Sequence, residues 1–299
     1  MTVRADAAGT VRIGGELEVA RLGYGAMRLT GQPGNWGSYP DPEGGKAVLR
    51  RAVELGVTLI DTAHAYGPGF NEALVAAALH PYPAGVVITT KCGIAKVGPG
   101  IMYRDGRPKA IRTICEASLK QLRLETIDLL QLHWVDEDTP IEESVGAMQD
   151  LVRAGKIRHI GISNVTLDEF ERARRTVPIA SVQNRFSLAR QEHGELVDRC
   201  AAAGIVFFPY GPLGADAFAV HAPLADTAGP HAAAAATFSS RCVAERVPGI
   251  GMLVAPRASS QARASWAGVQ PRAAAAAAWG PPVSANGAWT ANASAPSGP

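Results

Sequence analysis

The residues of this chain that are best suited to chemistry follow short apolar runs, spaced along its first two thirds. Six of the seven β-rich runs end in a polar or aromatic group, and these groups are Asp61, Lys91, His133, Ser163-Asn164, Gln183 and Tyr210. Because barrel enzymes collect their chemistry at the C-terminal ends of several strands, we expect these side chains to lie together. The pattern therefore predicts one site that many strands assemble.

Four residues of this region have the chemistry to polarise a carbonyl group and to protonate it. Tyr66 is a useful general acid if a nearby ammonium lowers its pKa from about 10 toward neutrality, and Lys91 would supply that charge. Asp61 would hold Lys91 as an ion pair, and His133 would hydrogen-bond the carbonyl of the substrate. Such a site also needs a hydride donor, so a nicotinamide cofactor is implied.

The β-rich runs alternate with helical patterns, which indicates parallel βαβ units in an α/β protein. The runs lie at 21–25, 57–60, 85–90, 127–132, 157–162, 179–182 and 205–209, and apolar residues recur at helical spacing within 48–53, 111–122 and 141–152. A doubly wound sheet and a barrel both fit this order. Polar groups at many strand ends favour the barrel, because GYGAM after the first run is not the GxGxxG of a dinucleotide-binding sheet.

Six ordered motifs give the chain a resemblance to the aldo-keto reductase family over about residues 10–215. The motifs are LIDTAHAYGPGFNE, TTK, LLQLH, GISN, SVQN and FPYGPLG. The resemblance implies a (β/α)8 TIM barrel, with an N-terminal β-hairpin at 11–19 closing its floor. It also implies NADPH-dependent reduction of an aldehyde or ketone, with NADP(H) as cofactor and a small-molecule carbonyl compound as substrate. Asp61, Tyr66, Lys91 and His133 would be the catalytic tetrad, and Tyr66 would be the proton donor.

The same resemblance assigns residues to the cofactor. Ser163, Asn164 and Gln183 would hydrogen-bond the nicotinamide carboxamide, and Tyr210 would stack on its ring. The full set of expected cofactor-binding residues is Gly23, Met27, Ser163, Asn164, Gln183, Tyr210, Pro212, Leu213 and Arg257. The run YGPGFN at 66–71 is similar to members of the family that act on pyridoxal or other small aldehydes.

The composition changes after about residue 215, so we divide the chain into a barrel at 1–215 and an atypical region at 216–299. The second region is rich in Ala, Pro, Gly and Ser, which is typical of disordered sequence. Its alanine runs, at 232–236 and 273–278, could equally form helices, because alanine has the highest helix propensity. The family pattern IPGTSS, followed by an E-N pair, is reduced here to VAPRASS at 254–260, where Arg257 would meet a phosphate. We therefore expect the eighth βα unit to be degenerate or missing, with 252–256 as its best candidate strand.

Two other functions stay open. The chain could be a nicotinamide-binding module that senses redox state or docks a partner with little turnover. It could also be an inactive product with a damaged C-terminus, because lysine, acidic residues and helical periodicity are lost together near the end. A shift of reading frame after Asp226 would explain that loss, and translating the gene in its other two frames would test it.

Composition excludes several classes of function. A net charge of +2 gives no reason to expect a nucleic-acid partner, and no stretch of about 20 strongly apolar residues suggests a membrane span. The four cysteines are scattered without a CxxC pair, and His64 with His133 lacks the HxH pair of a metal-dependent barrel, so we expect neither a disulfide framework nor a metal. We expect a cytoplasmic protein, and the oligomeric state is open.

Each candidate residue taken alone also has an ordinary structural explanation. Asp61 could cap a helix, and Ser163-Asn164 could cap the segment that starts at Thr166. Tyr66 could be a packed aromatic, Lys91 a solvated charge and His133 a hydrogen-bonded core histidine. These explanations give no reason for polar groups to recur at successive strand ends.

Overall fold

The computed structural model describes residues 4–187, 191–211 and 252–254. Eight strands form one parallel sheet in the order β11-β10-β9-β8-β5-β4-β3-β12. Their bounds are β3 Leu22–Gly25, β4 Leu59–Asp61, β5 Val87–Cys92, β8 Ile127–Leu132, β9 Ile157–Ser163, β10 Ser181–Gln183, β11 Val206–Phe207 and β12 Met252–Val254. The first seven overlap the seven runs predicted from the sequence, so the predicted α/β fold of parallel strands is confirmed.

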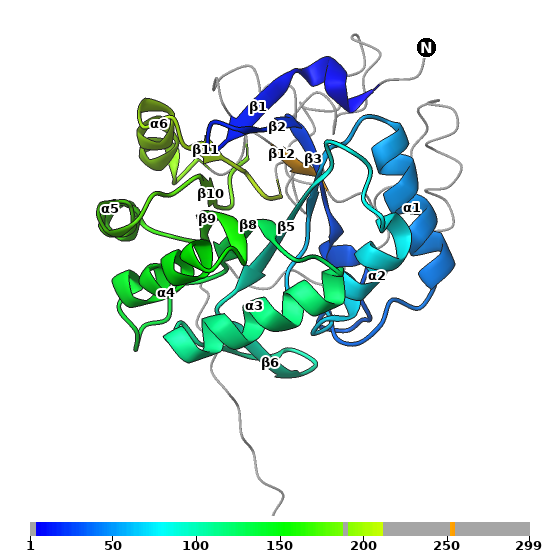
Figure 1. Cartoon of the computed structure of the whole chain (residues 1–299), viewed down its shortest axis with the longest axis horizontal. Coiled ribbons are helices and arrows are strands. Elements are labelled where there is room, and N and C mark those ends of the chain that lie inside the picture. The colour runs from blue at the N-terminus through cyan, green and yellow to red at the C-terminus, as the bar shows by residue number, and fades with distance from the viewer. Residues whose placement is uncertain (1–3, 188–190, 212–251, 255–299) are drawn as a thin grey trace, which may run out of the picture. The chain divides into compact units, whose positions relative to one another are not determined.

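Among the described residues, six α-helices follow one another around the outside of these strands in chain order (Figure 1). They are α1 Pro42–Glu54, α2 Phe70–Leu79, α3 Pro108–Leu122, α4 Ile141–Arg153, α5 Leu167–Thr176 and α6 Gly194–Ala202. Local sequence sets their starts. The Asp41 side chain accepts a hydrogen bond from Gly44 N at the start of α1, and Thr166 forms a capping box with Glu169 at the start of α5.

Two apolar layers lie between the helices and the strands. The larger layer joins α3 to α6 with strands β8 to β11 and includes Met148 and Phe170, both fully buried. The smaller layer joins α1 and α2 with β3, β4 and β5 and includes Leu49 and Ile60. Each helix buries its apolar stripe on the sheet, so the side chains that point to the other side of each strand form the barrel interior.

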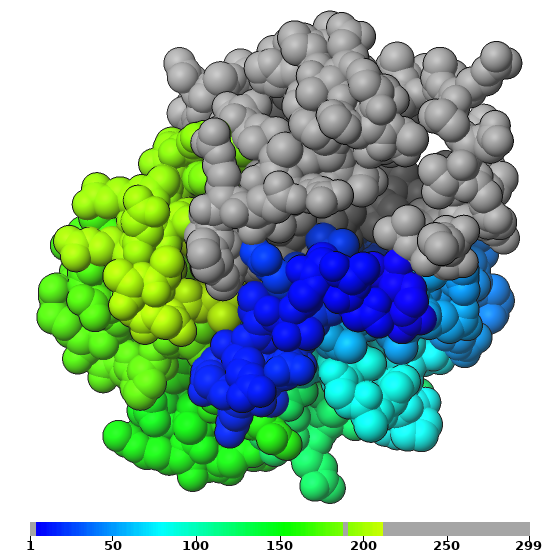
Figure 2. Space-filling view, turned by 90° about the horizontal axis from the view of Figure 1, so that it is seen from above, coloured from blue at the N-terminus to red at the C-terminus, as the bar shows by residue number. Residues whose placement is uncertain are grey.

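An N-terminal hairpin closes the floor of the barrel, as the sequence predicted. Its strands are β1 Thr10–Ile13 and β2 Leu17–Ala20, and they follow the short 3-10 helix η1 Ala5–Ala8. Apolar hairpin side chains pack against residues near the starts of the barrel strands, in a cluster that comprises Val11, Ile13, Val19, Leu59, Val87, Leu129, Ala180, Val206 and Phe208. Figure 2 shows the hairpin, in dark blue, lying across this face. Solvent is therefore excluded from the floor.

The candidate eighth strand of the sequence is a strand in the structure. β12 pairs with β3 in parallel, with Leu253 opposite Gly23. In the described part of the chain, β11 and β12 share no ladder. The segment after β12 lies outside the described residues, so a degenerate or missing eighth unit stays a prediction. The predicted boundary at residue 215, and the atypical region except β12, lie outside the described residues and stay predictions.

A second hairpin, which the sequence did not predict, follows β5. Its strands are β6 Ile94–Gly98 and β7 Ile101–Arg104. Lys96 Nζ donates to Asn35 O at 2.9 Å, and the same carbonyl accepts from Gly67 N at 3.0 Å. The hairpin is therefore tied to the loop after the 3-10 helix η2 Ala26–Arg28 and to the turn after β4.

Within the described residues, no helix is both long and apolar enough to cross a membrane.

The hairpin turn at the barrel floor gives a first prediction. Gly14 and Gly15 both have positive φ, but a Cβ on Gly14 would lie 2.2 Å from His159 Cε1, whereas a Cβ on Gly15 would meet nothing within 4 Å. We expect Gly15→Ala to cost about 1 kcal/mol of unfolding free energy from backbone strain. We expect Gly14→Ala to cost about 1 kcal/mol more, because the His159 ring must turn away and lose its 2.9 Å contact with Glu16. Urea unfolding of both variants checks this, and equal losses would contradict the described packing.

Candidate active site

A buried ion pair lies at the centre of the candidate site. Asp61 ends β4 and Lys91 lies near the end of the neighbouring strand β5, with exposed fractions of 4% and 1%. Lys91 Nζ donates to Asp61 Oδ1 at 2.8 Å and Oδ2 at 2.7 Å, and to Thr62 O at 2.9 Å. Burial lowers the pKa of Lys91, but the charges and hydrogen bonds of Asp61 and Tyr66 outweigh that effect, so its pKa is raised and the ammonium persists.

Two glutamines complete the surroundings of Asp61. Gln131 Nε2 and Gln183 Nε2 donate to Asp61 Oδ1 at 3.3 and 3.2 Å. Gln131 lies on β8 beside Lys91, and Gln183 ends β10. One carboxylate oxygen therefore accepts bonds from three strands, which satisfies a charge that would otherwise be costly to bury.

Tyr66 lies in the turn between β4 and α2, with its hydroxyl 3.4 Å from Lys91 Nζ. Its ring meets the His133 ring edge-on, with 5.6 Å between centroids. Backbone bonds shape the turn, since Tyr66 N donates to Ala63 O at 3.0 Å and Asn71 N donates to Tyr66 O at 3.3 Å. The four predicted tetrad residues are thus brought together.

The acidity of Tyr66 differs from the sequence-based expectation. Burial raises its pKa, and although the Lys91 charge opposes that effect, the net pKa stays above the ordinary tyrosine value. Burial outweighs the ammonium because Asp61 neutralises much of the charge of Lys91 at close range. Tyr66 is therefore a protonated phenol near neutral pH, which is the form that can donate a proton.

His133 follows β8, and its backbone N–H donates to Cys92 O at 2.8 Å. Burial, and then the charges of Lys91 and Lys96, hold the pKa of His133 well below its usual range. The imidazole is consequently neutral near pH 7. Its buried Nδ1 has no hydrogen-bond partner within the described residues, so the side chain is not the hydrogen-bonded core histidine of the alternative explanation.

The residues expected on the nicotinamide side form a second, connected group. Ser163 Oγ donates to Gln183 O at 2.7 Å, and Asn164 Nδ2 donates to His133 O at 2.9 Å. Tyr210, which follows β11, donates from its hydroxyl to Asn164 Oδ1 at 2.6 Å. Asn164 has a positive φ of 57°. This group borders the tetrad through His133 and through the bond from Gln183 to Asp61.

Other expected cofactor residues lie farther along the rim or outside the described residues. Gly23 is on β3 and Met27 is on η2, the segment that follows β3. Within the described residues, neither is hydrogen-bonded to the tetrad. Pro212, Leu213 and Arg257 fall outside the described residues, so their role stays a prediction.

The remaining structural explanations do not fit the observed contacts. Asp61 ends a strand and pairs with Lys91, so it caps no helix, and Lys91 is buried rather than solvated. Thr166 itself caps α5 through its capping box, so Ser163 and Asn164 are not needed there.

The structure also brings in residues that the sequence analysis did not select. Asn71 Nδ2 donates to Ala26 O at 2.9 Å and to Leu29 O at 2.7 Å, which ties the Tyr66 turn to η2. Glu72 and Gln131 are fully buried beside the ion-pair strands. The sequence held a signal for both. Gln131 lies on β8 two residues before His133, which directly follows that strand, and the alternation of a strand places residues two apart on one side. Asn71-Glu72 closes the longest motif.

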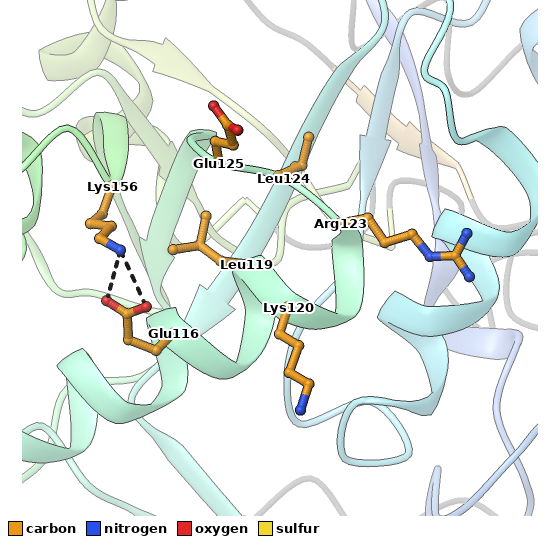
Figure 3. Close-up of a pocket in the computed structure, with 7 residues that line it drawn as sticks. All are labelled: Glu116, Leu119, Lys120, Arg123, Leu124, Glu125 and Lys156. Atoms are coloured by element: carbon orange, nitrogen blue, oxygen red, sulfur yellow. Dashed lines mark hydrogen bonds and ion pairs between the residues drawn. The ribbon is translucent and has the colours of Figure 1, made fainter.

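A hollow of about 490 Å³ lies elsewhere, at the end of α3 (Figure 3). It is lined by Glu116, Leu119, Lys120, Arg123, Leu124, Glu125 and Lys156, and an ion pair of 3.3 Å joins Glu116 to Lys156. These residues precede β8 or β9 and include no tetrad member, so the hollow is separate from the candidate site.

Among the described residues, no three His, Cys, Asp or Glu side chains are placed to hold a metal ion.

Comparison with known proteins identifies the family of this chain. The model of the aldo/keto reductase family matches residues 21–228. An uncharacterised oxidoreductase of Schizosaccharomyces pombe is 39% identical over 217 residues, covering 73% of this chain and 70% of that protein. Pyridoxine 4-dehydrogenase of Escherichia coli is 34% identical over 206 residues, covering 67% of this chain and 72% of that enzyme.

Solved structures resemble the fold closely. A glycerol dehydrogenase of Gluconobacter oxydans matches with a TM-score of 0.74 and 29% identity, over 84% of this chain and 86% of that one. An aldo/keto reductase of Klebsiella pneumoniae, solved with NADP and acetate, matches with a TM-score of 0.71 and 27% identity, over 86% and 88% of the two chains. The chain therefore belongs to the aldo/keto reductase family, a family of oxidoreductases, and the resemblance seen in its motifs is confirmed.

The buried ion pair gives a second prediction. Lys91→Met leaves the Asp61 carboxylate without its cation, and Asp61→Asn leaves the ammonium unpaired, so each should cost ~3–5 kcal/mol of unfolding free energy. The double variant should lose less than the sum of the two, because no unpaired charge remains. Guanidinium unfolding measures all three. Arg51→Met breaks the exposed pair with Glu54 and serves as a control that should cost under about 1 kcal/mol. Additive losses at Lys91 and Asp61 would contradict the coupling.

Proposed function

We propose that this protein reduces an aldehyde or ketone to an alcohol with NADPH, and that Tyr66 is the proton donor. One observation carries the proposal. The buried ammonium of Lys91 joins the Asp61 carboxylate to the Tyr66 hydroxyl, with the ring of a neutral His133 beside that tyrosine. A carbonyl oxygen between Tyr66 and His133 would meet two neutral donors, and such preorganised donors stabilise the negative charge that develops there.

The chain's own residues account for the proton. Tyr66 would give its hydroxyl proton to the carbonyl oxygen as charge builds on it, and Lys91 would stabilise the resulting phenolate. Asp61 would keep Lys91 in place, because it accepts hydrogen bonds from Lys91 and is itself held by two glutamines. His133 would orient the carbonyl, because a neutral imidazole can donate one N–H bond.

The residues at the ends of β9 and β10 fit the nicotinamide end of the cofactor. A carboxamide needs both acceptors and donors, and the hydroxyl and amide groups of Ser163, Asn164 and Gln183 offer both within one connected group. The bond from Tyr210 to Asn164 holds a flat ring beside that group. When bound, NADPH supplies the hydride. In this proposal Gly23, Met27, Pro212, Leu213 and Arg257 contact the rest of the cofactor, and the similar Klebsiella pneumoniae structure, solved with NADP, supports the choice.

The substrate proposed is a small aldehyde, with pyridoxal-like compounds as the first to try. Two observations support this choice. The run at 66–71 is similar to members that act on such aldehydes, and a relative with 34% identity is a pyridoxine 4-dehydrogenase. A cytoplasmic location and the division of the chain near residue 215 belong to the same proposal.

The direct test combines cofactor binding with turnover. NADPH binding is followed by quenching of tryptophan fluorescence, and reduction of a panel of aldehydes and ketones is followed at 340 nm. We expect saturable binding and reduction by the wild type. Tyr66→Phe should bind NADPH equally well and lose roughly 10²–10⁴-fold in kcat, because it removes the acid alone.

Other outcomes would point to the alternatives. Equal NADPH binding by both proteins with negligible turnover in both would favour a nicotinamide-binding module. A folded wild-type protein that binds no NADPH would favour an inactive product.

The pKa directions give a third prediction, for the pH dependence of reduction. The active form has Tyr66 protonated and His133 neutral. The pKa of His133 lies well below 6.5 and that of Tyr66 lies above 10.0. From about pH 6.5 to about pH 10, kcat/KM should therefore be flat, since neither group titrates there. It should fall above that window as Tyr66 ionises. A descending limb near pH 7 in wild type, absent in His133→Gln, would contradict the assignment.

A further inference from the structure

A second pair of ionisable side chains lies directly behind the tetrad. Glu72, in the first turn of α2, is fully buried. Its Oε1 accepts a hydrogen bond from Thr90 Oγ1 at 2.6 Å, and its Oε2 lies 3.4 Å from His64 Nδ1. Neither Oε2 nor that Nδ1 has another partner within the described residues. The two unpartnered atoms therefore face each other.

The contacts of Glu72 reach both segments that carry the reacting groups. Thr90 immediately precedes Lys91 on β5, and His64 lies two residues before Tyr66 in the turn after β4. The backbone joins the same segments, since His64 N donates to Lys91 O at 3.3 Å and Gly69 N donates to His64 O at 3.0 Å. One carboxylate thus bridges the Tyr66 turn and the Lys91 strand.

The burial of Glu72 makes this bridge important. A fully buried carboxylate without a partner is strongly unfavourable, and in the described part of the chain His64 is the one basic group within ion-pair distance of Glu72. Moving His64 away would isolate Glu72 in the core, so the turn is held where it is.

The hydroxyl of Tyr66 depends on such support because its own hydrogen bonding is slight. Within the described residues, the hydrogen bond of its hydroxyl is the long one to Lys91 at 3.4 Å. Lys91 is fixed independently by Asp61 and by Thr62 O. The distance between acid and ammonium therefore varies with the position of the Tyr66 turn. Asn71 anchors that turn on the η2 side, and Glu72 anchors it on the β5 side.

We propose that Glu72 and His64 are positioning residues, which keep the Tyr66 hydroxyl within reach of Lys91 and so support the proton transfer. This inference rests on the proposed function, because it gives Tyr66 the role of acid. Glu72 and His64 themselves touch neither substrate nor cofactor in this assignment.

The fourth prediction compares two substitutions at Glu72. Glu72→Ala removes both contacts, whereas Glu72→Gln keeps an oxygen for Thr90 and offers an N–H₂ to His64 Nδ1. We expect Glu72→Ala to lower kcat roughly 10- to 100-fold through misplacement of the acid, with the Kd for NADPH unchanged. Glu72→Gln should stay close to wild type, and His64→Leu should resemble Glu72→Ala.

Asp128→Ala controls for a general loss of stability. Asp128 is a partly buried carboxylate near the start of β8, 3.2 Å from Arg158 and at the strand end opposite the tetrad. The Asp128→Ala substitution should lower the unfolding midpoint without lowering kcat of the folded enzyme. A kcat for folded Glu72→Ala equal to that of wild type would overturn the proposal, as would an equal loss in Glu72→Ala and Glu72→Gln.

A readout without turnover separates this inference from the proposed function. Labelling tyrosine at Cζ with ¹³C and assigning the Tyr66 signal with Tyr66→Phe allows its ionisation to be followed by NMR. Releasing the turn exposes Tyr66 to water, so in Glu72→Ala and His64→Leu its pKa should fall toward the ordinary tyrosine value, and in Glu72→Gln it should not. An unchanged Tyr66 titration in both disrupting variants would overturn the positioning role even if the enzyme is active. A wild type without reductase activity would overturn the proposed function alone.

Discussion

The site depends on the burial of one ion pair, Asp61 with Lys91. Taking two charges out of water is costly, and the pair persists because both charged groups have several hydrogen-bond partners. Lys91 donates hydrogen bonds to the carboxylate and to a backbone carbonyl. Asp61 also accepts hydrogen bonds from two glutamine amides, one on β8 and one on β10. This requirement fixes the relative positions of four strand ends. Gln183, which is expected on the cofactor side, is hydrogen-bonded to the same carboxylate that holds Lys91. Asp61 therefore anchors both the tetrad and the residues expected to bind the nicotinamide.

The electrostatic consequence is a site with little free charge. Asp61 cancels Lys91 at close range, His133 is neutral, and Tyr66 is a protonated phenol. An approaching neutral carbonyl therefore meets donors rather than ions, and the ammonium becomes important when Tyr66 loses its proton. A low-dielectric surrounding strengthens that response, because the interaction between Lys91 and a phenolate is then poorly screened.

The sequence was most informative where chemistry coincides with strand ends. Alternating β-rich and helical runs predicted the parallel strands, and six ordered motifs predicted the family. The polar groups that end the runs predicted the candidate site, because the ends of parallel strands lie together. It was least informative where the outcome depends on packing. The direction of the Tyr66 pKa shift requires the depth of burial, and the bond from Gln131 to Asp61 joins residues 70 positions apart. The β6–β7 hairpin has little apolar alternation that faces a core, since β7 is exposed throughout, so no pattern marked it.

The pairing of β12 with β3 also has a consequence for the order of folding. Strands β4, β5, β8, β9 and β10 pair with strands that are their neighbours in the chain or are separated by one short hairpin. The contact between Gly23 and Leu253 spans the widest sequence separation of any strand pair described. Loops that close over short distances form with less loss of entropy, and segments nearer the N-terminus leave the ribosome first. The strands that carry Asp61, Lys91 and His133 can therefore associate while the last strand is still to be synthesised.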